Sequence, residues 1–179
     1  MTQAVPLVLH AAPAAGFDEP FEMLAACHER VQRMLRLLRR LAAHLGEHGA
    51  DAQAAQAAVD VMRYFDEAAP RHHDDEELHV LPRLREQGQA GLADRLHAQH
   101  VAMHAAWARL REDLADVAAG RPPAGAHADF VARGEAFAAM YDEHIPLEDG
   151  QAYPQARAAL DAAALQAMSA DMAARRGLR

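Results

Sequence analysis

The sequence predicts an all-α protein, organised as an up-down four-helix bundle with an appended C-terminal helix. About a quarter of the 179 residues are alanine, only 5% are aromatic, and β-branched residues are scarce, which favours helix over sheet. Apolar residues recur at helical period along several long segments that short loops connect. Long amphipathic helices joined in this way pack as antiparallel neighbours. The chain has the length of a single domain.

The first helix is expected to begin at Asp18-Glu19-Pro20, where an acidic side chain can cap the helix and proline suits the first turn. Residues 1–17 before it are expected to form an extended segment. Apolar side chains recur at helical period as far as Gly46 or Gly49, where the helix should end.

A second helix is expected to begin at Asp51 and to bury Val59, Met62 and Phe65. Proline inside a helix lacks the N–H that the helix needs, and its ring clashes with the preceding turn. We therefore expect Pro70 to kink or break this helix, which then resumes and ends near residue 88.

Three further helices complete the predicted fold. The third should run from about Gly91 to Gly120, followed by a loop over residues 121–125. The fourth covers about residues 129–151, with Pro146 inside it, and a short fifth covers about residues 155–176. We assign residues 18–158 to the bundle and residues 159–179 to the C-terminal helix.

Charge and composition exclude several classes of function. The formal net charge is −8 and all 18 basic residues are arginine, so binding to nucleic-acid phosphates is not expected, nor is lysine-dependent chemistry. The single cysteine, Cys27, excludes an intramolecular disulfide and a zinc site built on several thiolates. The first residues do not resemble an export signal, and no stretch approaches the roughly 20 apolar residues that cross a bilayer. We therefore expect a soluble, cytoplasmic protein that does not bind membranes.

The sequence repeats itself with an offset of 72 residues. Chemically matching residues lie at this offset: His28 and His100, His72 and His144, Glu76 and Glu148, Glu77 and Asp149, Pro82 and Pro154. Bulky apolar residues follow the same register, for example Phe65 with Phe137. The simplest account is two related helical hairpins packed about a pseudo-two-fold axis, which brings the matched side chains to the middle of one bundle. Glu77 and Asp149 can then accept hydrogen bonds from the imidazoles.

Each half contributes one lone histidine and one His-x-x-x-Glu sequence. On an α-helix, residues four apart differ by about 40° around the axis and about 6 Å along it, so both side chains face one point. Four imidazoles and two carboxylates suit iron, manganese or zinc. Two carboxylates can bridge two ions about 3.5–4 Å apart and leave positions open for a small molecule. The candidate metal ligands are His28, His72, Glu76, His100, His144 and Glu148.

Two more histidines are possible additional ligands. A lone histidine on an apolar stripe is more often a core residue than a ligand, but buried glutamates need partners. In the third helix, the phase of the apolar stripe places His100 in the core and His104 at its border. In the second helix the local phase favours His73, whereas the repeat favours His72, because His73 aligns with Ile145. We therefore keep His73 and His104 as possible extra ligands.

The motifs around these residues resemble the hemerythrin family, in its HHE cation-binding branch. They are Ala-Cys-His28-Glu-Arg, His72-His73-Asp-Asp-Glu76-Glu77 with Pro82, Gln-His100, and His144-Ile-Pro-Leu-Glu148-Asp149 with Tyr153-Pro154. The resemblance covers about residues 18–158 and implies a four-helix bundle holding a non-haem di-iron centre. It implies the following roles: terminal ligands His28, His72, His100 and His144, and bridging carboxylates Glu76 and Glu148.

Two departures from the family's oxygen carriers bear on function. Those carriers have a fifth histidine one turn before the third-helix ligand, where this chain has Leu96, and an aspartate where it has Glu148. A fifth histidine ligand would have to be His104 or His73. The resemblance therefore implies binding or sensing of O2, nitric oxide or peroxide, or iron handling, rather than reversible oxygen carriage.

Two alternatives remain open at the level of sequence. One is an enzyme, a di-iron protein that consumes oxygen or peroxide, although a ferritin-like oxidase would carry Glu-x-x-His. The other is a structural zinc or metal-free bundle acting as an interaction module. We favour a binding or sensing protein over an enzyme, with two iron ions as the cofactor and zinc or manganese as alternatives. A protein partner or a second copy of the chain would have to relay any signal.

Overall fold

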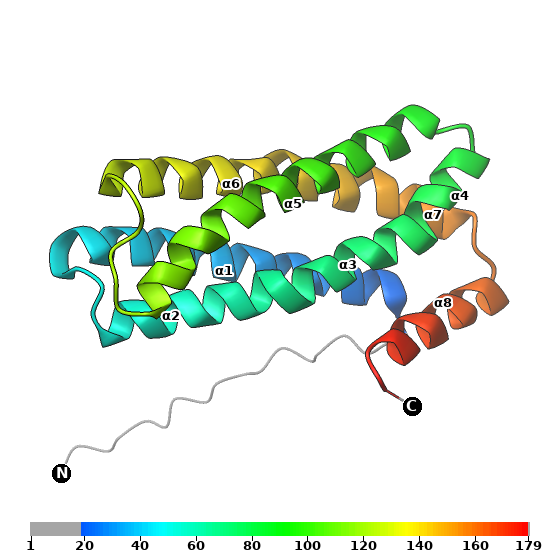
Figure 1. Cartoon of the computed structure of the whole chain (residues 1–179). Helices are drawn as coiled ribbons and strands as arrows, with labels where there is room; N and C mark the ends of the chain where they lie inside the picture. Colours follow the sequence, from blue (N-terminus) through cyan, green and yellow to red (C-terminus); the bar gives the residue numbers. More distant parts are fainter. Residues whose placement is uncertain (1–18, 179) are drawn as a thin grey trace, which may run out of the picture.

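The computed structural model describes residues 19–178, and every regular element in this range is helical (Figure 1). The predicted extended segment, residues 1–17, and Asp18 lie outside the described residues. Helix α1 (Pro20–His48) begins with proline in its first turn, as predicted. Gly49 follows it with a φ of 73°, a backbone conformation that glycine adopts without strain. The all-α class is confirmed.

The second arm of the first hairpin is one long helical segment that contains two π-helical turns. It consists of α2 (Ala52–Arg63), η1 (Tyr64–Ala68), α3 (Ala69–Asp75), η2 (Glu76–Val80) and α4 (Leu81–Glu86). Asp51 caps its start by accepting a hydrogen bond from the Ala54 amide at 2.8 Å. One predicted core position is wrong: Val59 is 41% exposed, and Ala58 and Val61 face the core instead.

The sequence predicts a kink or a break at Pro70, and the structure shows that the helical segment is not broken there. The Ala69 N–H bonds the Tyr64 carbonyl five residues earlier and closes a π turn directly before the proline. The extra residue in this turn makes room for the proline ring, which would clash in a regular α-helix. Both other π turns are likewise followed by a proline, Pro82 after η2 and Pro154 after the corresponding turn of the second hairpin.

The second hairpin consists of α5 (Ala90–Ala118) and a segment made of α6 (His127–Leu147), η3 (Glu148–Ala152) and α7 (Tyr153–Ala158). The last helix is α8 (Ala162–Arg175). The expectation that the fifth helix begins near residue 155 is wrong, because η3 carries the fourth helix past Pro154. Asp161 caps the start of α8 by accepting a hydrogen bond from the Ala164 amide at 2.8 Å.

The two hairpins have similar courses (Figure 1), and most of their elements match at an offset of about 72 residues; η1 is the exception, because α6 is a regular helix at the corresponding residues. The π turns η2 and η3 begin at Glu76 and Glu148, and α4 and α7 end at Glu86 and Ala158, each pair 72 positions apart. Helices α1 and α5 both pack against α2 and α6, so the four helices form a closed ring of neighbours. This is the predicted bundle of two pseudo-symmetric hairpins.

A buried polar layer divides the core into two apolar clusters. On α5, Leu96 belongs to one cluster and Met103 to the other, with buried His100 between them. On α1, buried His28 separates the same two clusters. The fold therefore places its buried histidines at one level of the bundle, between two layers of apolar packing.

Helix α8 packs against α1 and is tied to α3 by a buried carboxylate. Nη2 of Arg176 lies 2.6 Å from Oδ2 of Asp75, whose side chain is fully buried, and Arg175 bonds the other oxygen. Arg175 also pairs with Asp171 on α8 itself. Two guanidinium groups thus compensate the charge that Asp75 carries into the interior.

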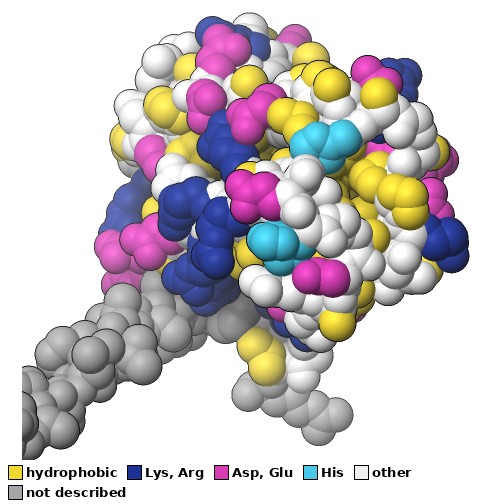
Figure 2. All heavy atoms as spheres, turned by 90° about the vertical axis from the view of Figure 1, so that its left-hand side faces the viewer, with side chains coloured by type: hydrophobic (Ala, Val, Ile, Leu, Met, Phe, Trp, Pro, Cys, Tyr) yellow, Lys and Arg dark blue, Asp and Glu magenta, His cyan; other side chains and the backbone are white. Residues whose placement is uncertain are grey.

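Charged side chains of both signs share the surface. Figure 2 shows arginine and acidic side chains next to one another at the end of the bundle that lies on the left in Figure 1. Elsewhere on the described surface, as at this end, ion pairs form between such groups: Arg39 pairs with Glu135, and Arg83 on α4 pairs with Glu86. Within residues 19–178, no helix has the length and apolar character needed to span a membrane.

Candidate metal centre

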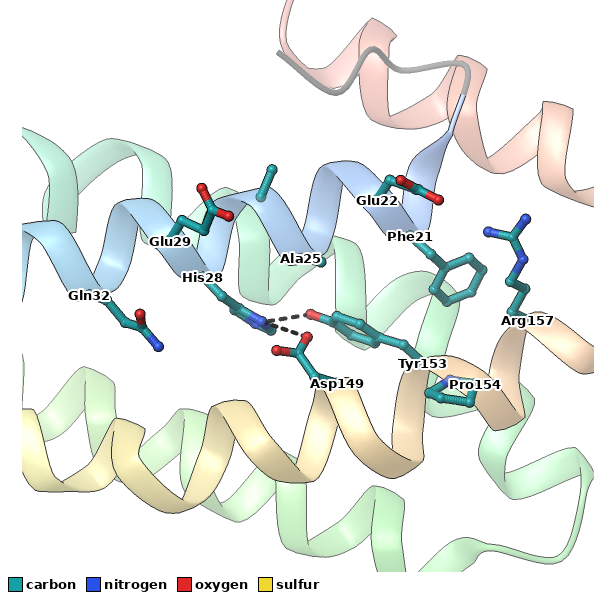
Figure 3. A pocket seen from close by; sticks show the side chains of 11 residues that line it. Phe21, Glu22, Ala25, His28, Glu29, Gln32, Asp149, Tyr153, Pro154 and Arg157 are labelled. Atoms are coloured by element: carbon teal, nitrogen blue, oxygen red, sulfur yellow. Dashed lines mark hydrogen bonds and ion pairs between the residues drawn. The ribbon is translucent and has the colours of Figure 1, made fainter. Parts of the chain in front are cut away.

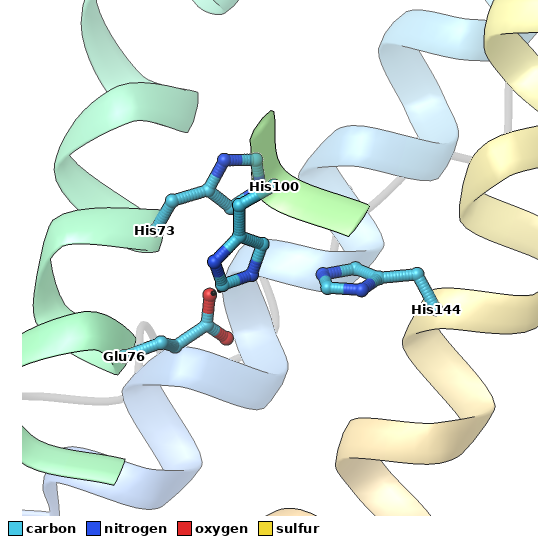
Figure 4. A group of neighbouring side chains, drawn as sticks. All are labelled: His73, Glu76, His100 and His144. Atoms are coloured by element: carbon cyan, nitrogen blue, oxygen red, sulfur yellow. Dashed lines mark ion pairs between the residues drawn. The ribbon is translucent and has the colours of Figure 1, made fainter. Parts of the chain in front are cut away.

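The structure brings all six predicted ligand residues together in the buried polar layer. Their side chains come from all four helical segments and each residue is at most 3% exposed: His28, His72, Glu76, His100, His144 and Glu148. His73 on α3 is 2% exposed and joins them. Their donor atoms form two groups, and the atoms of each group lie within 4.8 Å of one another. One group consists of His28, His72, Glu76 and Glu148. The other, drawn in Figure 4, consists of His73, Glu76, His100 and His144. Two groups that share one carboxylate suit two neighbouring cations.

The His-x-x-x-Glu sequences give the same contact in both halves. Nε2 of His72 is 3.2 Å from Oε1 of Glu76, and Nε2 of His144 is 3.1 Å from Oε1 of Glu148. In both pairs the histidine lies on an α-helix and the glutamate is the first residue of a π turn. The predicted convergence of imidazole and carboxylate within each half is therefore present in the fold.

His28 is held between two acidic residues of the second hairpin. Its Nε2 lies 3.0 Å from Oε2 of Glu148, and its Nδ1 donates a hydrogen bond to Asp149 at 2.9 Å (Figure 3). A hydrogen bond at Nδ1 fixes the tautomer in which Nε2 is free to bind a cation. A cavity of about 740 Å³ opens beside His28, and its lining includes Glu22 and Glu29.

The pseudo-two-fold axis produces the same arrangement around His100. Its Nε2 is 3.4 Å from Oε2 of Glu76, and its Nδ1 donates a hydrogen bond to Glu77 at 2.8 Å. The predicted role of Glu77 as an acceptor for an imidazole is therefore confirmed. His144 is oriented differently, because its Nδ1 donates to Oε1 of Gln99 at 3.0 Å.

The structure distinguishes between the two possible extra ligands. His73 is buried, and its ring stacks on that of His100 with centroids 4.3 Å apart. His104 is exposed, and its Nε2 lies 3.2 Å from Nδ1 of His73. The geometry therefore favours His73 as a fifth histidine, with His104 holding it from outside.

Sequence analysis missed one residue of the layer, Tyr153. Its hydroxyl donates a hydrogen bond to Oε1 of Glu76 and lies 3.1 Å from Nε2 of His28. In a regular α-helix, Tyr153 would lie about 140° around the axis from Glu148, but the π turn between them returns it to a similar face. The repeat carried no signal for this role, because the matching position is Leu81.

Six buried nitrogen and oxygen atoms of this layer have no partner with hydrogen-bond geometry within the described part of the chain, although imidazole nitrogens and carboxylate oxygens of the layer lie 3.0–3.5 Å apart. They are Nδ1 of His72, Nε2 of His100 and of His144, Oε2 of Glu76, and both carboxylate oxygens of Glu148. An unpaired buried polar group costs about 1–3 kcal/mol, so native proteins rarely retain one. Imidazole nitrogen with carboxylate oxygen is a donor set for iron, manganese and zinc. The residues present therefore fit a metal centre.

Burial and neighbouring charges shift the protonation of these groups in the metal-free protein. Burial lowers the pKa of His72 and of His73 well below the usual range, so both are neutral and able to bind a cation. Burial also opposes protonation of His28, but the carboxylates of Asp149 and Glu148 raise the pKa of His28 to about 9. Burial and the neighbouring carboxylate of Glu148 raise the pKa of Glu76 well above its usual range.

We expect the metal-free protein to lose stability as the pH rises from about 6.5 to about 9. The pKa of His28 is about 9 in the folded protein and 6.5 in the unfolded chain. The stability that protonated His28 contributes to the fold is therefore complete below pH 6.5 and is lost as the pH rises through 9. The raised pKa values of His100 and Glu76 act in the same direction. The loss from His28 is on the order of 3 kcal/mol. Urea denaturation at pH 6.5 and at pH 9 measures this loss of unfolding free energy. Between the same pH values, the Asp149→Asn variant should lose less unfolding free energy than the wild type. Equal losses in the two proteins would contradict the role of Asp149.

We expect Tyr153→Phe to lower the unfolding free energy of the metal-free protein by about 1–3 kcal/mol. The change removes the hydroxyl that contacts Glu76 and His28, both of which stay buried. Urea denaturation of the metal-free chain measures the loss. Tyr64→Phe is the matched control, because among the described residues its hydroxyl bonds a backbone carbonyl, that of Cys27, and no carboxylate, and its cost should be about 1 kcal/mol or less. A Tyr153→Phe protein as stable as the wild type would contradict the contact.

Fold and site together define a helical bundle with a buried histidine–carboxylate cluster suited to a metal cation. A family model described as the hemerythrin HHE cation binding domain matches residues 19–156. The chain belongs to this hemerythrin family, which confirms the resemblance identified from the sequence. It is also similar to a protein of Haemophilus influenzae, described only as uncharacterized, with 36% identity over 169 residues that cover 92% of this chain and 94% of the relative.

Proposed function

We propose that this chain is a non-haem di-iron protein that binds or senses a small ligand, or handles iron. In this proposal the terminal ligands are His28, His72, His100 and His144, and the bridging carboxylates are Glu76 and Glu148. His73 would serve as a fifth histidine. Bound iron would supply a redox-active centre able to take up O2, nitric oxide or peroxide.

The observation that best supports this proposal is the set of six buried atoms, drawn from both hairpins, that have no hydrogen bond within the described residues. Bound cations would pair with atoms that otherwise carry a desolvation cost. The chain's own residues also orient the ligands, because Asp149 accepts a hydrogen bond from His28 and Glu77 accepts one from His100. Such contacts to ligand imidazoles commonly raise metal affinity 10–100-fold.

We favour binding or sensing over turnover and place the protein in the cytoplasm. Asp149 and Glu77 each accept a hydrogen bond from an imidazole, an arrangement that suits holding ligands better than acting as a free general acid or base. Cys27 is a buried free thiol, which suits a reducing compartment. Residues 18–158 would form the metal-binding unit and residues 159–179 its appendage.

Metal content per chain, measured together with the electronic absorption spectrum, tests the proposal. For protein purified from cells supplied with iron, we expect two irons per chain and near-ultraviolet bands that shift when azide or nitric oxide is added. One zinc per chain, or no metal and a featureless spectrum, would overturn the proposal and favour a structural bundle.

A further inference from the structure

A cavity of about 490 Å³ lies between helix α1 and the helical segment that runs from α2 to α3. Its lining carries four arginines and two carboxylates, although the whole chain has a formal net charge of −8. The arginines come from both sides of the cavity: Arg30 and Arg33 from α1, Arg63 from α2 and Arg71 from α3. Positive charge is therefore concentrated here in a protein that is acidic overall.

One of these four arginines is neutralised by a carboxylate of the same lining. Nη2 of Arg63 lies 3.0 Å from Oδ1 of Asp60. The other three arginines, Arg30, Arg33 and Arg71, form no ion pair within residues 19–178. All three residues are exposed. Their guanidinium groups are therefore accessible to an anion from solution, with which they can form charge-assisted hydrogen bonds.

The 72-residue repeat indicates that the bundle itself does not require these arginines. The second hairpin has the same candidate ligands, but it carries alanine or glutamate at the four corresponding positions. The pairs are Arg30 with Ala102, Arg33 with Ala105, Arg63 with Glu135, and Arg71 with Glu143. Because the helices of the second hairpin form and pack without positive charge at these positions, ligand binding explains the arginine cluster better than folding does.

The same cavity also offers apolar surface. Met34 and Leu37 on α1 line it and are packed, partly buried, against the core. Tyr64 on η1 lines the facing side, where its hydroxyl donates a hydrogen bond to the Cys27 carbonyl at 3.2 Å. A volume of about 490 Å³ lies within the usual range for small-molecule sites, which combine apolar walls with a few polar groups.

We propose that this cavity binds a small organic phosphate. The guanidinium groups of Arg30, Arg33 and Arg71 hold the phosphate group, and the organic part packs against Met34 and Leu37. A guanidinium fork matches the geometry of phosphate. The terminal oxygens of a phosphomonoester point in different directions, so they can accept hydrogen bonds from both sides of the cavity, whereas the two oxygens of a carboxylate lie in one plane. The inference is independent of the proposed metal function, because the described lining of the cavity includes none of the candidate ligands.

Calorimetric titration of the full wild-type chain with phenyl phosphate tests the site. We expect saturable binding that is tighter than that of inorganic phosphate, which has no apolar part, and that weakens in high salt, which screens exposed charges. Phenol, which has no phosphate group, should show no saturable binding. The same titration after chelation of any metal should give the same affinity for phenyl phosphate. Absence of saturable binding, equal affinity for inorganic phosphate, or binding that disappears with the metal would overturn the proposal.

The double variant Arg33→Gln/Arg71→Gln removes one guanidinium group from each side of the cavity. It should weaken the binding of phenyl phosphate about tenfold or more. Both residues are exposed and form no ion pair within residues 19–178, so the fold should be unaffected. Arg109→Gln is the matched control, because Arg109 is likewise exposed without an ion pair among the described residues and lies outside the lining of the cavity. Equal affinities of the double variant and the control would overturn the proposal.

A second measurement uses the unaltered chain. Phenylglyoxal modifies accessible arginines, and mass spectrometry of peptides locates the modified residues. Phenyl phosphate should slow the modification of Arg33 and Arg71, which line the cavity, and leave that of Arg109 unchanged. Equal rates of modification at Arg33 and Arg71 with and without phenyl phosphate would overturn the proposal.

Discussion

We expect Glu148→Gln to abolish metal binding while the bundle stays folded. Both carboxylate oxygens of Glu148 are buried without a hydrogen-bond partner, and the Nε2 atoms of three histidines lie within 3.5 Å of them: His28, His100 and His144. A neutral amide offers one oxygen and no charge, so it cannot bridge two cations. We expect metal affinity to fall on the order of 100-fold or more, and metal per chain after dialysis, measured by elemental analysis, to fall to near zero.

Glu135→Gln is the matched control, because Glu135 lies on α6 and forms an exposed ion pair with Arg39. It should keep the metal content of the wild type. His72→Ala and His144→Ala should lose the metal as Glu148→Gln does. Full metal content in both histidine variants would contradict the assignment of the site.

The fold and the main side chains of the site could be predicted because their signals are periodic. Helical period located the arms of both hairpins, and the offset of 72 residues predicted that His72 and His144 would meet in one layer. The repeat also selected His72 where the local phase favoured His73. Both histidines are buried in the layer, which agrees with keeping His73 as a possible additional ligand.

The features that escaped prediction depend on backbone hydrogen bonding and packing that no residue spacing encodes. Pro70 predicted a kink or a break, but a π turn before it keeps the helical segment continuous. A third π turn brings Tyr153 to Glu76 and His28, although helical phase places it elsewhere.

Removing the metal is expected to lower the Tm of the wild-type protein by about 5–10 °C. A ligand that binds only the folded state at 100 times its Kd stabilises it by about 2.7 kcal/mol, and each kcal/mol shifts the Tm of a chain of this size by about 2–4 °C. The physical origin is the set of six buried atoms that have no hydrogen-bond partner within residues 19–178. Differential scanning calorimetry before and after chelation, followed by adding the metal back, measures the shift.

The Glu148→Gln variant separates loss of the metal from a direct effect of the chelator. Because this variant should carry no metal, chelation should leave its Tm unchanged. Its Tm should not exceed that of the metal-free wild type, since the amide lacks the charge that pairs with the imidazole of His28 3.0 Å away. If the wild type carries metal and its Tm does not change on removal, the metal is bound outside the buried layer and the assignment of the centre is wrong.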